Sequence, residues 1–242
     1  MAVAAVDDAG NDLRDEPADV RTYFIASLPH QAGVGATGRG ICQQNRNPLV
    51  ANAVLRALLV AMDKWVSEGT EPPASRIPRV ADGTLVATLP QKEQGFPHIP
   101  GIKYTGRMHT GDLFDYGPQA GKGILTILPP RLIGTPYPAL VPKADLDGND
   151  IAGIRLPEVA VPLATYTGWN LRAVPTGGDD GCDSFGQQVD FARSKAERIT
   201  DADPRLSLEE RYPSHVDYVN RVTAVATGLA DDRLLLDEDV HA

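Results

Sequence analysis

The sequence lacks the features of a disulfide-rich, membrane-spanning or nucleic-acid-binding protein. It has two cysteines in 242 residues, and aromatic side chains make up only 6%. No apolar run approaches the roughly 20 residues that cross a bilayer. Acidic side chains outnumber basic ones, 32 to 23, which gives a net charge of −9. Because nucleic acids and anionic membranes attract clustered lysine and arginine, we expect neither as a partner.

The two cysteines, Cys42 and Cys182, are too few and too far apart for a zinc site. Two outcomes fit them: a disulfide in an exported protein, or a pair of buried thiols. The first ten residues, MAVAAVDDAG, lack the basic start and longer apolar run of a signal peptide, so we expect none in this stretch and leave the compartment open. The histidines show neither H-x-x-x-H nor H-E-x-x-H spacing, and we expect no metal and no cofactor.

Glycine and proline are abundant instead, with 23 and 20 residues. From residue 71 to about residue 186 one or the other recurs every few positions, as in GFPHIPG and ILPPRLIGTPYP. An interior proline removes a helical hydrogen bond and clashes with the preceding turn, so short strands and loops are predicted there. Two capping pairs, Ser207 with Glu210 and Ser214 with Asp217, predict that helices return near the end of the chain.

The N-terminal part predicts half of an α/β unit. Residues 20–28, VRTYFIASL, are rich in β-branched and aromatic side chains and predict a short, mostly buried strand. After a long loop, NPLVANAVLRALLVAMDKWVSEG predicts a helix that Asn47 caps and Gly69 ends. Six residues at three- and four-residue spacing form an apolar stripe on this helix, which is expected to face other parts of the protein: Leu55, Leu58, Leu59, Met62, Trp65 and Val66.

Three motifs resemble functional sites but fit structural roles better. Gly33, Gly35 and Gly38 have the spacing of a dinucleotide-binding loop, yet no helix follows them directly, so a flexible loop is the better interpretation. Ser184 in CDSFG resembles a nucleophile elbow without the strand that an elbow needs, and a helix cap for FARSKAER fits it better. Residues 145–150, DLDGND, form an incomplete calcium loop and predict a tight turn.

His30 is the strongest catalytic candidate in the chain. It follows the predicted strand and precedes the long helix. In serine hydrolases of the α/β-hydrolase type, the triad histidine lies on a loop after the last strand and before the final helix. A histidine there accepts the proton of the nucleophile and returns it to the leaving group. The alternative is a loop histidine whose ring bonds backbone carbonyls.

Four segments that together cover nearly the whole chain carry a resemblance to a known family. They are VRTYFIASLPHQAG, NPLVANAVLRALLVAMDKWVSEGTEPPASRIPR, LVPKADLDGNDIAGIRLPEVAVPLATYTGWNLR and FARSKAERITDADPRLSLEERY. They are similar to the C-terminal part of bacterial proteins described as α/β-hydrolase domain proteins, and IAGIRLPEVAVPLATYTGWNLR is the most specific stretch. Family members commonly carry Thr-Gln-His or a similar triplet where this sequence has Leu28-Pro29-His30. The resemblance therefore implies that His30 occupies the triad-histidine position, although its neighbours differ.

The resemblance implies an α/β fold class, with this chain as the C-terminal portion of an α/β-hydrolase-like fold. Residues 1–70 are expected to form the last strand, the catalytic-histidine loop and the final long helix. Residues 71–242 are expected to form a Pro/Gly-rich irregular extension with short strands and C-terminal helices, packed on the same domain. In the family the nucleophile elbow and the triad acid lie upstream of the strand, so neither has a counterpart in this sequence.

The expected function is the C-terminal part of a serine hydrolase that cleaves a small-molecule ester or related acyl bond. This chain alone is expected to be inactive, with His30 as the general base of the complete enzyme. Tyr166, Trp169 and Arg172 of TYTGWNLR are expected to line the substrate pocket, although such aromatic clusters also form packed core. The alternative is a non-catalytic binding or assembly subunit whose strand edge and helix stripe complete a partner chain or a missing N-terminal region.

Overall fold

The computed structural model describes residues 6–7, 9–13, 16–30, 38–108, 111–182 and 184–240, apart from the side chain of Thr135. Its strands are β1 (Leu85–Ala87), β2 (Asp112–Asp115), β3 (Arg131–Pro136), β4 (Leu140–Pro142), β5 (Ala164–Thr167) and β6 (Gln187–Asp190). They form three separate antiparallel pairs, β1 with β4, β2 with β3 and β5 with β6. Within these ranges no pair joins another to make a larger sheet.

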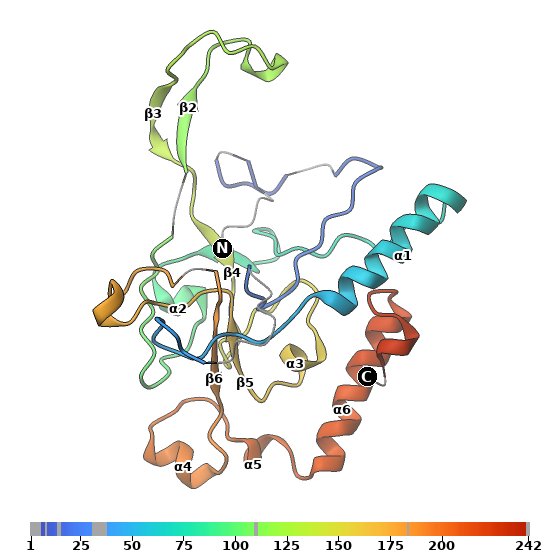
Figure 1. Cartoon of the computed structure of the whole chain (residues 1–242), viewed down its shortest axis with the longest axis vertical. Coiled ribbons are helices and arrows are strands. Elements are labelled where there is room, and N and C mark those ends of the chain that lie inside the picture. Colours follow the sequence, from blue (N-terminus) through green and yellow to red (C-terminus); the bar gives the residue numbers. More distant parts are fainter. Residues whose placement is uncertain are drawn as a thin grey trace.

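The α-helices are α1 (Asn52–Glu68), α2 (Gln91–Gln94), α3 (Pro157–Ala160), α4 (Lys195–Thr200), α5 (Leu208–Arg211) and α6 (His215–Asp231). Short 3-10 helices lie at Ala120–Lys122, Val174–Thr176 and Asp237–Asp239. The β2–β3 hairpin projects from one end of the molecule (Figure 1). Helices α1 and α6 both lie along one side of the molecule, at the right in Figure 1. Among the described residues, no helix is both long enough and apolar enough to cross a membrane.

The predicted strand at residues 20–28 forms only isolated bridges, which corrects the expectation of a last sheet strand. Tyr23 pairs in parallel with Arg76, and Ile25 pairs in parallel with Ile154. The pairing of Tyr23 with Arg76 stops after one bridge because Pro78, two residues after Arg76, has no N–H to continue the ladder. The segment is therefore extended between two loops without belonging to a sheet.

The long helix forms as predicted at its C-terminal end but not at its start. Gly69 adopts the left-handed conformation with φ of 73°, and its N–H donates to the Trp65 carbonyl at 3.1 Å. The helix begins at Asn52 after Ala51, which supplies no side-chain cap. The prediction that Asn47 caps the helix is wrong, because the Asn47 side chain is buried and bonds other backbone groups, described below.

The face of α1 that packs against the core differs from the predicted stripe of large apolar side chains. Small side chains let the helix approach closely, and the buried residues are Val54, Ala57 and Ala61. Leu58 packs against the same core from a partly buried position. Four residues of the predicted stripe point outward instead, with exposed fractions of 56% for Leu55, 69% for Leu59, 52% for Met62 and 81% for Val66.

The main core lies between the start of α1, the extended segment before it and the C-terminal part of α6. Its buried members are Val54, Ile154, Leu156, Ala226, Leu229, Leu234 and Leu235. A second cluster surrounds β5, and a third joins Phe96, Ile99 and Ala144. The main core contains residues from before and after residue 70. The division of the chain into residues 1–70 and 71–242 stays a prediction.

The C-terminal helices confirm the capping patterns. Ser207 and Glu210 form a complete capping box at α5, and the Ser214 side chain accepts the Asp217 N–H at α6. Helix α4 is capped by Ser194 rather than by Ser184, so that part of the prediction is wrong. Ser194 lies directly before the helix, whereas β6 separates Ser184 from it.

Candidate functional site

A cavity of about 410 Å³ opens beside the extended segment. Phe24 and Leu28 of that segment form part of its wall. The remaining wall comes from three stretches far apart in the sequence, residues 104–108, 168–171 and 179–181, together with single residues that include Gln94, Val141 and Asp150. Volumes of this size are typical of small-molecule sites.

Aromatic rings form one side of the cavity. Tyr104 and Trp169 both line it, and their ring centroids lie 5.9 Å apart in an edge-to-face arrangement. Phe96 packs behind them, 5.6 Å from Tyr104 and 5.3 Å from Trp169. The Tyr104 hydroxyl donates to the Thr88 carbonyl at 2.7 Å, and burial raises the pKa of Tyr104 to about 12. Tyr104 is thus a fixed, neutral aromatic surface.

The two amide side chains on the cavity wall, those of Gln94 and Asn170, already form hydrogen bonds with backbone groups. The Asn170 Nδ2 donates to the carbonyls of Gln44 and Gly186, and its Oδ1 accepts the Leu171 N–H at 2.9 Å. The Gln94 Nε2 donates to the Pro142 carbonyl at 3.0 Å, and its Oε1 accepts an N–H as well. These amides hold the wall in shape and leave little bonding capacity for a ligand.

Charged residues at the rim are paired with one another. Asp179 forms an ion pair with Lys103, and this hydrogen bond lowers the pKa of Asp179. Arg107 and Asp180 approach to 4.0 Å, and both are well exposed, at 73% and 70% of their side-chain surface. Because these two cations and two anions balance, the described charged pairs at the rim carry no net charge.

Asp150 is different, because it is a partly buried residue of the cavity wall whose carboxylate is only partly hydrogen-bonded. Its Oδ2 accepts the Ser27 N–H at 2.7 Å, and its own N–H donates to the Ser27 Oγ at 2.9 Å. Among the described residues nothing bonds the second carboxylate oxygen, and Asp150 retains partial exposure. Burial raises its pKa to about 6, an effect that the Ser27 hydrogen bond partly offsets.

Ser27 marks the point where the extended segment turns toward His30. It is 1% exposed and has φ of 59°, a left-handed conformation that costs a serine about 1 kcal/mol. Its carbonyl accepts the Asn47 Nδ2 at 2.7 Å, and the same amide also donates to the Thr167 carbonyl at 3.0 Å. The turn is therefore held from two sides, by Asp150 and by Asn47.

His30 follows this turn and is exposed. It is the last described residue before residues 31–37, and among the described residues no hydrogen bond reaches its ring. His30 is also absent from the described lining of the cavity, in which Leu28, two residues earlier, is the last residue of the extended segment. Its assignment as the triad histidine stays a prediction. Gly33 and Gly35 of the glycine-rich loop lie outside the described residues.

The three predicted substrate-binding residues have separate locations. Trp169 lines the cavity. Tyr166 is buried in the core around β5, 8% exposed, and is not among the residues that line the cavity. Arg172 is adjacent to the cavity wall, where its Nε donates to the Gly181 carbonyl at 3.2 Å. Of the three, Trp169 lines the cavity, whereas Tyr166 and Arg172 are not among the described residues that line it.

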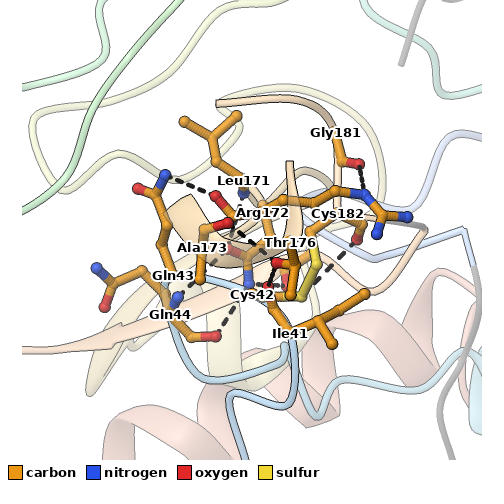
Figure 2. Close-up of a disulfide and its surroundings, with 12 residues drawn as sticks. Ile41, Cys42, Gln43, Gln44, Leu171, Arg172, Ala173, Thr176, Gly181 and Cys182 are labelled. Atoms are coloured by element: carbon orange, nitrogen blue, oxygen red, sulfur yellow. Dashed lines mark hydrogen bonds between the residues drawn. A yellow bond between two sulfur atoms is a disulfide. The ribbon is translucent and has the colours of Figure 1, made fainter. Parts of the chain in front are cut away.

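A disulfide between Cys42 and Cys182 fastens the end of the long loop to this wall (Figure 2). The two α-carbons lie 5.6 Å apart although 140 positions separate the residues. Backbone bonds reinforce the link, because the Gln43 N–H donates to the Leu171 carbonyl and the Ala173 N–H donates to the Ile41 carbonyl (Figure 2). Of the two outcomes that the sequence left open, the structure has the disulfide.

Of the other two motifs, residues 145–150 have the structural role predicted for them, whereas Ser184 does not cap a helix. The 145–150 segment is a tight turn in which the Asp145 Oδ1 accepts the N–H groups of Asp147 and Asn149. Ser184 lies in a turn, with no helix between it and β6. In the part of the chain that is described, no three His, Cys, Asp or Glu side chains are grouped to hold a metal ion.

A family model described as Alpha/beta hydrolase domain matches residues 3–242. The chain belongs to the alpha/beta hydrolase domain family. This confirms the resemblance inferred from the four sequence segments and supports assignment to a hydrolase family. No curated protein and no solved structure matches the chain. The helices and strands agree with the coarse α/β class, whereas the described sheets are too small to confirm a C-terminal portion of the hydrolase fold.

Sequence reasoning did not select several residues that shape the cavity, among them Asp150, Tyr104 and Arg107. Asp150 was considered only as part of a turn. Its role depends on Ser27, which lies 123 positions away, so no local pattern marks it. For Tyr104, the only local signal is an aromatic residue within a loop rich in glycine and proline.

Proposed function

We propose that this member of the alpha/beta hydrolase domain family contributes His30, as general base, to the hydrolysis of a small-molecule ester or related acyl bond. One observation carries the proposal beyond family membership. The reciprocal hydrogen bonds between Ser27 and Asp150 tie the turn that leads to His30 to the wall of the cavity. A substrate in the cavity would therefore lie near the loop that carries the histidine.

In this proposal His30 takes the proton of an attacking serine hydroxyl and returns it to the leaving group. The serine and the triad acid come from polypeptide outside these 242 residues, and the chain alone is inactive. Trp169 contacts the substrate, while Arg172 and Tyr166 support the wall from behind. Residues 1–70 then correspond to the end of the hydrolase-like domain, and residues 71–242 to the extension that supplies most of the pocket.

The test combines this chain with the polypeptide that supplies the serine and measures hydrolysis of p-nitrophenyl esters. His30→Ala is expected to lower kcat by about a thousandfold or more, because a triad acts as a unit. His215→Ala is the matched control, since this exposed histidine begins α6 and is distant in sequence from the cavity residues. Turnover that survives His30→Ala would overturn the proposal.

A fluorophosphonate probe gives a second check that needs no substrate. It should label the serine of the assembled protein and leave the isolated chain unlabelled. Labelling of the isolated chain at Ser184 would contradict the assignment of the nucleophile to another polypeptide.

The exposed face of α1 favours a second candidate, an assembly subunit that completes a partner chain. Leu55, Leu59, Met62 and Val66 form this face, and all are at least half exposed. Because the family is an α/β-hydrolase family and the described residues hold only two-stranded sheets, the partner we propose is the polypeptide that carries the remaining hydrolase sheet. Contact with that sheet would remove these side chains from water.

Leu59→Glu tests this second function. It should weaken association with the sheet-bearing polypeptide, measured by analytical ultracentrifugation, while leaving the melting temperature of the isolated chain within about 2 °C, because the residue is exposed. Asp63→Asn, an exposed change on the same helix, is the control. Unchanged association with Leu59→Glu would exclude this face as the contact.

A further inference from the structure

We propose that the cavity binds an organic ammonium group, with Asp150 as its carboxylate partner and the rings of Trp169 and Tyr104 beside it. The inference rests on the proposed function in taking the cavity as the substrate site. It then names the substrate class as acyl compounds whose body carries a protonated amine. Three features of the cavity lead to this class.

The first feature is the bonding capacity that remains on the wall. The amides of Gln94 and Asn170 have backbone partners for both donor and acceptor, and the Tyr104 hydroxyl donates to a carbonyl. Asp150 uses one carboxylate oxygen for the Ser27 N–H. Within the described residues its other oxygen accepts no hydrogen bond, so the strongest acceptor left for a ligand is an anionic one.

The second feature is the charge of Asp150. Among the described residues, the charged side chains that act on it are Asp145 and Arg155. Arg155 does not neutralise it, because its Nη2 bonds the Asp145 carboxylate at 2.9 Å and the Val159 carbonyl at 3.0 Å. With a pKa of about 6, Asp150 is mostly ionised at neutral pH. A carboxylate held in the interior at a cost in solvation favours a cation that enters the cavity.

The third feature is the aromatic wall. The rings of Trp169 and Tyr104 both line the cavity, and aromatic faces attract ammonium groups most strongly where water is excluded. Two described cations at the rim have anionic neighbours of their own, since Lys103 is paired with Asp179 and Arg107 lies beside Asp180. An interior anion with aromatic neighbours and a neutral rim suits a cation with an apolar body.

The test uses three probes of similar size and different charge, and none contains an acyl bond. They are 2-phenylethylammonium, 2-phenylethanol and phenylacetate, titrated into the full chain by calorimetry at pH 7.5. We expect the ammonium probe to bind at least about tenfold more tightly than the alcohol, and phenylacetate to bind least. Equal affinity of ammonium and alcohol, tighter binding of phenylacetate, or no binding of the ammonium would each overturn the proposal.

Asp150→Asn identifies the carboxylate responsible. It should remove the preference for ammonium over alcohol, whereas Asp63→Asn, which removes a surface charge on α1, should retain it. If Asp150→Asn does not fold, a pH titration of the unmodified protein provides the same information. The affinity for the ammonium probe should fall as pH drops through about 6, the pKa of Asp150, whereas the affinity for the alcohol should stay constant. A preference that survives both treatments would overturn the role of Asp150. Because the probes are not hydrolysed, these results are independent of whether His30 is catalytic.

Discussion

Asp150 and Ser27 are joined in both directions, since each backbone N–H bonds the side chain of the other residue at 2.7 to 2.9 Å. The link spans 123 positions of sequence. It connects the cavity wall to a turn in which Ser27 holds a left-handed backbone conformation. A change in Asp150 therefore affects both the electrostatics of the cavity and the path of the chain toward His30.

We expect Asp150→Asn to stabilise the unliganded protein near pH 8. The folded-state pKa of Asp150 is raised from 3.8 to about 6, so the ionised side chain costs stability above pH 6 and this cost fades as pH falls toward 4. Asparagine removes the charge and keeps an oxygen for the Ser27 N–H. The gain in unfolding free energy at pH 8 is at most about 3 kcal/mol.

Urea unfolding at pH 8 and pH 4 measures this difference. The stabilisation should be present at pH 8 and nearly absent at pH 4, with Asp63→Asn as the control for lost surface charge. A variant less stable than the natural protein at pH 8 would show that the carboxylate is not a net cost there.

Asn47→Ala should destabilise the protein by about 2–4 kcal/mol, because it leaves buried backbone groups without partners. Asn47 is 3% exposed and donates to the carbonyls of Ser27 and Thr167, and it also accepts the Leu49 N–H. Asn52→Ala is the matched control, since Asn52 is exposed at the start of α1. Thermal unfolding of the two variants should differ by several degrees, and equal melting temperatures would contradict the structural role of Asn47.

Replacement of both Cys42 and Cys182 by alanine should cost about 2–5 kcal/mol of unfolding free energy, because the disulfide closes a long loop. The two residues are 140 positions apart, and both are buried. The natural protein should lose a similar amount in a reducing agent, whereas the variant should not respond to the reductant. Equal stability of the natural protein with and without reductant would contradict this expectation.

Arg205 should be the costliest single cation to remove. It is 3% exposed, forms an ion pair with Asp203, and donates to the Thr165 hydroxyl and to the carbonyls of Val189 and Asp190. Arg205→Met leaves a buried carboxylate uncompensated, so we expect a loss of about 3–5 kcal/mol. The double variant with Asp203→Asn should recover part of it in denaturant titrations, and additive losses would contradict the pairing.

The sequence predicted the features that depend on neighbouring residues. The end of α1 at Gly69 and the caps at Ser207 and Ser214 each require a few consecutive positions, and all three form. Hydrophobic periodicity located α1 but not its buried face. The predicted stripe contains three leucines and no alanine, yet the close approach to the core is made through Ala57 and Ala61.

Features that depend on distant partners were not accessible in the same way. Residues 20–28 have strand composition, but their pairing is limited by Pro78 and by the turn at Ser27, and only the folded chain brings these together. The pairing of the cysteines stayed open for the same reason. Asp150 looked like an ordinary turn residue, because its partner Ser27 and the aromatic rings near it come from other parts of the sequence.

The Cys42–Cys182 bond also makes residues 42–182 a covalent ring, and the projecting β2–β3 hairpin belongs to that ring (Figure 1). A single proteolytic cut in the hairpin would open the ring without releasing a fragment. The nicked protein would migrate at its full mass until it is reduced, and only then separate into two pieces.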